Sequence, residues 1–186
     1  MKSIFAATTL LALASALVSA TPVVQRRQVI TIPASDLWII TNPAPATILT
    51  PTSGADATIS IVDGSNEIDT IVSFDLGVNP SPISTSTCQF VIEGITPPTG
   101  SGIVQLFTLG GDVDPTQVLT SVPYYNQYEG QYDVTTGTST PIDVPYVPCN
   151  FDAEGRLQFV IRPQNTDDYI TFTQTDLSGA FILYSP

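Results

Sequence analysis

Apolar and polar residues alternate in short segments along most of this chain, which predicts β-strands with one buried face each. In 57–63, for example, Ile59 and Ile61 alternate with Thr58 and Ser60. The alternating or β-rich segments are 37–41, 57–63, 71–76, 88–93, 156–162, 168–174 and 180–184. Within 156–162 the pattern places Arg156, Gln158 and Arg162 on the solvent side.

Clusters of Gly, Pro, Asn, Asp and Ser separate these segments, as turns do, and no helical pattern of useful length follows residue 20. Short strands at such spacing are typical of an antiparallel β-sandwich. The predicted fold is therefore all-β, a single antiparallel β-sandwich domain. Residues 57–186 form its body, and 28–56 hold a first strand and a Pro/Thr-rich connector. This connector and the Ser/Thr run at 82–87 are candidates for O-linked sugar.

The first 20 residues have the composition of a secretory signal peptide. A short basic start precedes an apolar run, and small residues up to Ala20 suit signal peptidase. Residues 21–27 then form a short propeptide that ends in Arg26-Arg27, a pair that suits dibasic processing in the Golgi, although two solvated arginines are the alternative. We expect the mature chain to begin at Gln28 and to be secreted, either extracellular or associated with the cell wall.

The two cysteines are predicted to form one disulfide. Export takes Cys88 and Cys149 through an oxidising compartment. Cys88 lies on the apolar side of its segment, which suggests a bond between the two sheets. Closing a loop of about 60 residues contributes roughly 4 kcal/mol in the chain-entropy model.

The chain is strongly acidic, with 17 Asp and Glu against 5 Lys and Arg, and a formal net charge of −12. Removal of 1–27 leaves Arg156 and Arg162 as the basic residues. Nucleic acids and anionic membrane surfaces are poor partners for such a chain. No segment after the signal is long and apolar enough to span a membrane. The predicted partners are cell-wall polysaccharide or an extracellular protein.

The order of several short motifs resembles a fungal secreted family, named after the But-two protein and called the ubiquitin-three-binding C-terminal domain. The motifs are "IVSFD", "CQFVIEGITPP", "TGSGIVQLFTL", "PYYN", "VPCN" with "LQFVI", "YITFTQ" and "SGAFILY". Together they cover roughly 36–185. The resemblance implies an extracellular, disulfide-linked β-sandwich from a filamentous fungus, with no established enzyme activity.

Composition also limits the chemistry. The chain has no histidine, and its single lysine, Lys2, lies in the signal peptide, so triads, imidazole metal sites and Schiff bases are excluded from the mature chain. We expect no cofactor and no metal. Carboxylates remain as acids and bases, and their closest groupings are Asp112 with Asp114 and Asp167 with Asp168. Both groupings lie in turn-rich segments, where solvated turn-forming aspartates are the main interpretation.

A tyrosine-rich segment is the candidate binding site. Tyr124, Tyr125, Asn126 and Tyr128 combine aromatic faces with polar tips, which is the chemistry of sugar-binding platforms. The alternative is that these tyrosines pack a strand, since aromatic residues are common in sheets. Trp38 is predicted to lie in the core.

The sequence thus favours a secreted, non-catalytic β-sandwich with a structural or binding role at the cell wall or extracellular surface. A carbohydrate-binding module that uses the tyrosine-rich segment is the second hypothesis. A carboxylate-dependent glycan hydrolase, which needs two suitably spaced acids, is the third.

Overall fold

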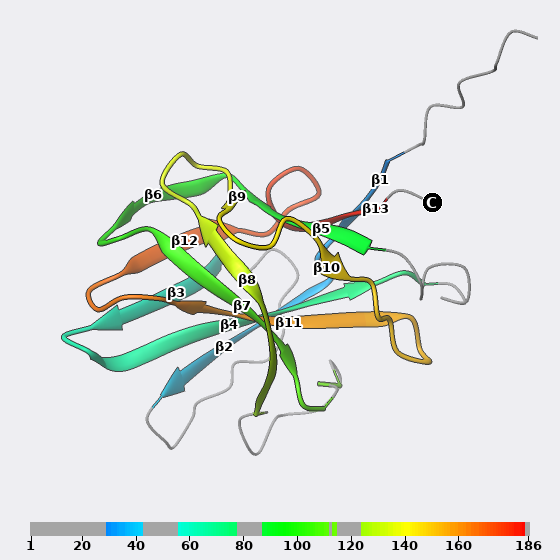
Figure 1. Cartoon of the computed structure of the whole chain (residues 1–186), viewed down its shortest axis with the longest axis horizontal. Helices are drawn as coiled ribbons and strands as arrows, with labels where there is room; N and C mark the ends of the chain where they lie inside the picture. The colour runs from blue at the N-terminus through cyan, green and yellow to red at the C-terminus, as the bar shows by residue number, and fades with distance from the viewer. Residues whose placement is uncertain (1–28, 43–55, 78–86, 112, 115–123, 185–186) are drawn as a thin grey trace, which may run out of the picture.

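The computed structural model describes residues 29–42, 56–77, 87–111, 113–114 and 124–184, and in them the protein is a sandwich of two antiparallel β-sheets (Figure 1). The fold class predicted from the alternation is confirmed. The predicted signal peptide and propeptide, with Ala20, Arg26 and Arg27, lie outside the described residues. So do most of the two connectors, at 43–55 and 78–86.

The smaller sheet has four strands in the order β1-β13-β5-β10. Their bounds are β1 Ile30–Pro33, β5 Thr87–Glu93, β10 Val147–Pro148 and β13 Gly179–Tyr184. The C-terminal strand β13 therefore lies inside the sheet, between the first strand of the chain and β5.

The larger sheet runs β6-β12-β3-β4-β11-β7-β8-β9, and β2 also pairs with β4. Its strands are β2 Asp36–Asn42, β3 Asp56–Val62, β4 Ser65–Asp75, β6 Ile95–Thr99, β7 Ile103–Leu109, β8 Tyr125–Asp133, β9 Thr140–Pro141, β11 Arg156–Pro163 and β12 Tyr169–Thr173. A two-residue turn joins β3 to β4, and both of its residues, Asp63 and Gly64, have positive φ (52° and 64°). An Asp-Gly pair suits this turn because both positions need the left-handed region.

The main core lies between the two sheets, and aromatic rings fill its centre. Phe74 of β4 and Phe159 of β11 meet Phe90 of β5 with ring centroids 5.9–6.3 Å apart, and Tyr132 of β8 packs on Phe90 at 5.5 Å. Phe74 and Phe159 also lie 6.3 Å from each other, and all four pairs are edge-to-face, the arrangement that aromatic quadrupoles favour. The predicted inward positions of 71–76, 88–93 and 156–162 are thus the positions that join the two sheets.

The central strands β4 and β11 bury their second face as well, which the alternation did not predict. Phe107, Leu109 and Tyr125 pack on a second apolar cluster there, made of Trp38, Ile40, Ile71, Val113 and Val160. Gln158, expected on the solvent side, is buried on this face, where its amide nitrogen donates to the Val113 carbonyl and its amide oxygen accepts from the Val113 N–H, both at 2.7 Å. The residues after β7 therefore cover this part of the sheet, and Trp38 is a core residue as predicted.

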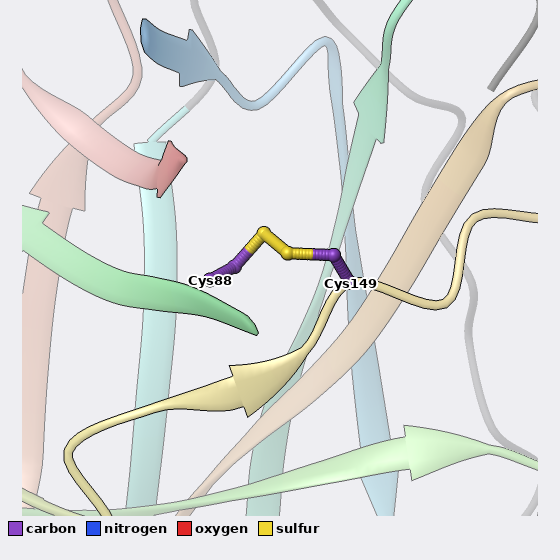
Figure 2. Close-up of a disulfide and its surroundings, with 2 residues drawn as sticks. All are labelled: Cys88 and Cys149. Carbon is purple, nitrogen blue, oxygen red and sulfur yellow. A yellow bond between two sulfur atoms is a disulfide. The ribbon is translucent and has the colours of Figure 1, made fainter. Parts of the chain in front are cut away.

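The disulfide joins Cys88 and Cys149, as predicted, with both side chains fully buried. Figure 2 shows the bond running from the start of β5 to the segment that follows β10. Because Val147 of β10 pairs with Cys88 of β5, the bond links neighbours at the edge of one sheet. The expectation of a bond between the two sheets is wrong, since the period-two pattern shows which face holds a cysteine but not where its partner strand lies.

Candidate functional site

The structure separates the four residues of the tyrosine-rich segment that were predicted to bind a ligand. Tyr124 is exposed at 68%, whereas Tyr125 is half-buried, and Asn126 and Tyr128 are exposed. Tyr128 instead donates a hydrogen bond from its hydroxyl to Asp143 at 2.5 Å. These side chains do not form a single aromatic platform.

Tyr125 belongs to a buried polar network on the covered face of the larger sheet. Its hydroxyl donates to the carboxylate of Asp69, and its ring lies 4.4 Å from the guanidinium carbon of Arg162. Arg162 also donates to Glu67 through Nε at 2.8 Å and through its Nη2 atom. Tyr125 is therefore a packing and hydrogen-bonding residue of this face.

Asp69 is the fully buried acid of this network. Burial raises its pKa to about 7, and Glu67 nearby adds to the increase, while Tyr125 and Arg162 oppose it. Its Oδ2 atom lies 3.6 Å from Nε of Arg162, but its Oδ1 atom is buried without a hydrogen bond. The network is thus tied together by one arginine that serves two carboxylates.

A polar cavity of about 230 Å³ opens where β7, β8 and β11 approach the segment that follows β10. Its polar lining includes Thr108, Asn126, Gln127, Glu129, Asn150 and Gln158. Asn126 is the one residue of the predicted binding set in this lining. The cavity is smaller than the roughly 300–1,000 Å³ of pockets that enclose a drug-sized ligand, so it suits one ring or the end of a chain.

Glu129 enters the cavity from a β-bulge. Leu106 pairs with Gly130 and the next residue, Phe107, pairs with Tyr128, so Glu129 is an extra residue with no partner across the ladder. Bulges redirect side chains and are frequent next to functional sites. Gly130 next to it has φ of 145°, and a Cβ there would lie 3.1 Å from Val144. The glycine therefore permits the bulge that aims Glu129 into the cavity.

Glu129 has no polar partner within the described part of the chain. The residue is only 5% exposed, and none of the hydrogen bonds or ion pairs found there involves its carboxyl group; its oxygen atoms are not among the enclosed unpaired ones and so remain open to the cavity. Burial raises its pKa. Buried carboxyl groups are normally hydrogen-bonded or paired, so an unpaired one that lines a cavity marks a place for a ligand group.

Three carboxamides in the cavity lining are also free. The side chains of Asn126, Gln127 and Asn150 make no hydrogen bond among the residues that the structure describes. Each offers one acceptor and two donors. Gln158 differs from them because its amide is fully used by Val113 and by the Ser73 hydroxyl at 3.2 Å.

The second acid of the cavity, Asp152, already has partners. Its carboxylate accepts from the backbone N–H groups of Glu154 at 3.0 Å and Arg156 at 2.7 Å. Nε of Arg156 lies 3.2 Å from it, and Glu154 lies 3.7 Å from the same guanidinium. These bonds hold the turn before β11, so Asp152 is a structural residue and Arg156 carries two acidic neighbours.

The aspartate groupings that the sequence suggested as acid pairs lie elsewhere. Asp112 is outside the described residues. Asp167 has φ of 66° and accepts from the Asp63 N–H at 2.8 Å, as a turn former does. Asp168 is fully buried, so its interpretation as a solvated turn residue is wrong: it accepts from the Ser101 hydroxyl at 2.8 Å and the Asn165 N–H at 3.1 Å.

Asp168→Ala should lower the free energy of unfolding by about 2 kcal/mol, because the fully buried carboxylate holds the partly buried backbone N–H groups of Ser101 and Asn165 and its removal leaves them unpaired. Thermal melts at neutral pH measure this loss. Asp167→Ala is the matched control at the exposed neighbour and should cost about half as much or less. Equal melting temperatures for Asp168→Ala and the unchanged protein would contradict this structural role.

Sequence reasoning missed Glu129, although one signal was present. A glycine inside a strand pattern indicates a bulge or a close backbone approach, and Gly130 stands within "YYNQYEGQYD". That signal locates the irregularity but does not say which neighbour it redirects. The position of the cavity also depends on the segment after β10. That segment is placed by the pairing of β10 with β5, a strand that lies far from it in the sequence.

Comparisons with known proteins do not assign this arrangement. No protein-family model matches the chain, and no curated protein is similar to it. Among the described residues, no helix could cross a membrane, and no group of three or more Cys, Asp and Glu side chains could hold a metal ion.

Proposed function

We propose that this protein is secreted and that it binds carbohydrate, without catalysis, in the cavity between β8 and the segment after β10. One observation carries the proposal: Glu129 is buried without a partner in a cavity whose lining also holds free carboxamides. Sugar hydroxyls donate and accept hydrogen bonds, and carboxamides with a carboxyl group can do both in return. The resemblance to a fungal secreted family and the signal-like start of the chain support a site of action at the cell wall or extracellular surface.

The cavity favours binding over glycoside hydrolysis. Hydrolysis by the common mechanisms needs two carboxyl groups, one acting as acid and one as base or nucleophile. Glu129 would serve as an acid, since burial raises its pKa. Asp152, however, is engaged by two backbone N–H groups and by Arg156, which leaves it poorly placed to attack a substrate.

Exposed Tyr124 extends this site beyond the cavity. It lies two residues before Asn126, and its ring packs over Gly110, where a Cβ would come within 1.9 Å of it. An aromatic side chain held in this way keeps a face that can stack on a sugar ring. In this proposal the cavity binds the end of a glycan and Tyr124 contacts the neighbouring unit.

The test is retention on insoluble wall polysaccharides, followed by titration calorimetry with oligosaccharides of the retained polymer. Changing Asn126 and Gln127 together to alanine should weaken binding about tenfold or more, because the loss of two hydrogen bonds costs on the order of 1–3 kcal/mol. Tyr169→Ala is the control, since Tyr169 is an exposed aromatic residue on β12, away from the lining.

Equal retention of the double variant and the control would exclude the cavity as the binding site. Release of reducing sugar that disappears with Glu129→Gln would replace binding with hydrolysis as the function.

A further inference from the structure

The charges around Glu129 are not balanced within the protein. The lining holds the acids Glu129 and Asp152 and one base, Arg156. Asp152 lies 3.2 Å from this arginine and Glu154 lies 3.7 Å from it, so the arginine is already compensated. An ionised Glu129 therefore adds a negative charge that no neighbouring cation offsets.

No other basic residue within the described ranges supplies that cation. Its five basic residues are Lys2, Arg26, Arg27, Arg156 and Arg162. The first three lie outside the described residues, and Arg162 is already paired with Glu67 and Asp69. The titratable groups linked to Glu129 are acidic or neutral: Tyr128 is its neighbour in the chain, and the pKa of Tyr132 is raised by burial and then by Asp143, Glu129 and Tyr128.

A carboxylate that is largely removed from water and has no counter-ion is unfavourable, and a ligand that brings a positive charge offsets this cost. The net charge of −12 also attracts cations to the whole surface and repels anionic sugars. Free carboxamide oxygens around Glu129 can accept the remaining N–H bonds of an ammonium group, while the amide N–H groups donate to ring hydroxyls.

From this we infer that the ligand is a cationic amino sugar, whose protonated primary amine pairs with the carboxylate of Glu129 inside the cavity. The inference rests on the proposed carbohydrate-binding function and narrows its substrate class to glycans with free amino groups. An N-acetylated sugar of the same backbone lacks the charge and brings extra bulk into a cavity of about 230 Å³.

The pairing has a defined pH dependence. Glu129 must be ionised to bind the ammonium group, and burial raises its pKa in the free protein. Binding should therefore weaken as the pH falls through this raised pKa, and also as the pH rises through the pKa of the ligand amine; the bound ammonium should lower the pKa of Glu129. A ligand held by a protonated Glu129 would show the opposite trend.

The experiment compares two probes, the glucosamine tetramer and the N-acetylglucosamine tetramer, by titration calorimetry in about 0.15 M salt, where long-range attraction is screened. The glucosamine tetramer should bind about tenfold more tightly or better near neutral pH, and Glu129→Gln should remove this preference. Asp176→Asn is the control, because it removes the same charge from an exposed position between β12 and β13. Carbon NMR of the Glu129 carboxyl group gives a second readout, a fall in its pKa when the glucosamine tetramer is added.

The outcomes separate the two proposals. Equal or tighter binding of the acetylated probe, lost when Asn126 and Gln127 are changed, overturns the amine inference and keeps the cavity as a carbohydrate site. Binding of neither probe, together with no retention on wall polysaccharides, overturns the proposed function itself. A preference for glucosamine that Glu129→Gln and Asp176→Asn reduce equally means general charge attraction and overturns the pairing. If Glu129→Gln does not fold, the pairing is rejected when the pKa of Glu129 in the unchanged protein does not fall on adding the glucosamine tetramer.

Discussion

Replacing Cys88 and Cys149 with alanine should lower the free energy of unfolding by about 4 kcal/mol and the melting temperature by about 10 °C. The bond closes a sequence separation of 61 residues, so its loss returns considerable entropy to the unfolded chain. Both side chains are fully buried, and the substitution also removes their packing in the main core. Thermal melts of the two forms at one pH measure the difference.

Reductant provides the control for this prediction. It should lower the melting temperature of the unchanged protein towards that of the double variant and leave the double variant unaffected. If the unchanged protein and the double variant melt within about 2 °C of each other, packing alone holds the sheet edge formed by β5 and β10, and the prediction is wrong.

Arg162→Met should cost about 3 kcal/mol at neutral pH, because it removes the cation shared by Glu67 and the fully buried Asp69. This value is at the lower end for breaking a buried ion pair, since the arginine side chain keeps 25% of its surface exposed. Arg156→Met is the matched control. There the partner acid keeps two backbone N–H donors, and the loss should be about 1 kcal/mol.

The cost of Arg162→Met should depend on pH in a defined direction. The pKa of Asp69 is about 7 in the native protein, above its ordinary value of 3.8, so the native state binds the extra proton. The stability linked to this proton is fully present below about pH 4 and is lost as the pH rises through about 7. Without the arginine the pKa rises further, and the difference between variant and unchanged protein should grow from pH 5.5 towards pH 8.

Asp69→Asn tests the same network from the other side. The amide mimics the protonated acid, so this variant should lose most of the fall in stability between about pH 5.5 and 7.5, and it should rescue part of the Arg162→Met defect. Asp133 and Asp143 have lowered pKa values, so their protonation changes stability only at a pH below the range of about 5.5 to 7.5. Hydrogen bonds from Thr135 lower the pKa of Asp133. Burial raises the pKa of Asp143, but hydrogen bonds from the Tyr128 hydroxyl and from nearby backbone N–H groups lower it by more. A melting temperature that is highest at neutral or alkaline pH would contradict the assignment.

Local alternation predicted the strands that contribute most to the main core. Segments 57–63, 71–76, 88–93 and 156–162 all correspond to strands, because each has enough alternating positions to show a period of two. Several of the missed strands are short or rich in proline: β9 and β10 have two residues each, and β6 reads "ITPPT". Such strands form because a neighbour offers hydrogen bonds, and their own residues carry little signal. The seven-residue strand β7, which reads "IVQLFTL", was missed as well.

The candidate site was less predictable for the same reason. The segment around Asn126 could be singled out by composition, but Tyr125 turned towards Asp69, a residue 56 positions earlier in the chain. Glu129 reached the cavity only through a bulge whose register depends on β7. Composition shows which side chains are present in a segment, whereas the faces they occupy are set by pairings between distant strands.

The place of β13 inside the smaller sheet has a consequence for the synthesis of the protein. The ribosome makes Gly179–Tyr184 after all the other described strands, yet this strand separates β1 from β5 in the finished sheet. Until it emerges, β1 lacks the one strand with which it pairs in the described part of the chain, and the apolar residues Phe90 and Ile92 of β5 lack one neighbouring strand. The smaller sheet therefore cannot form until residue 184 has left the ribosome, and chaperones that shield unpaired strands should matter more for this protein than for one whose last-made strand lies at a sheet edge.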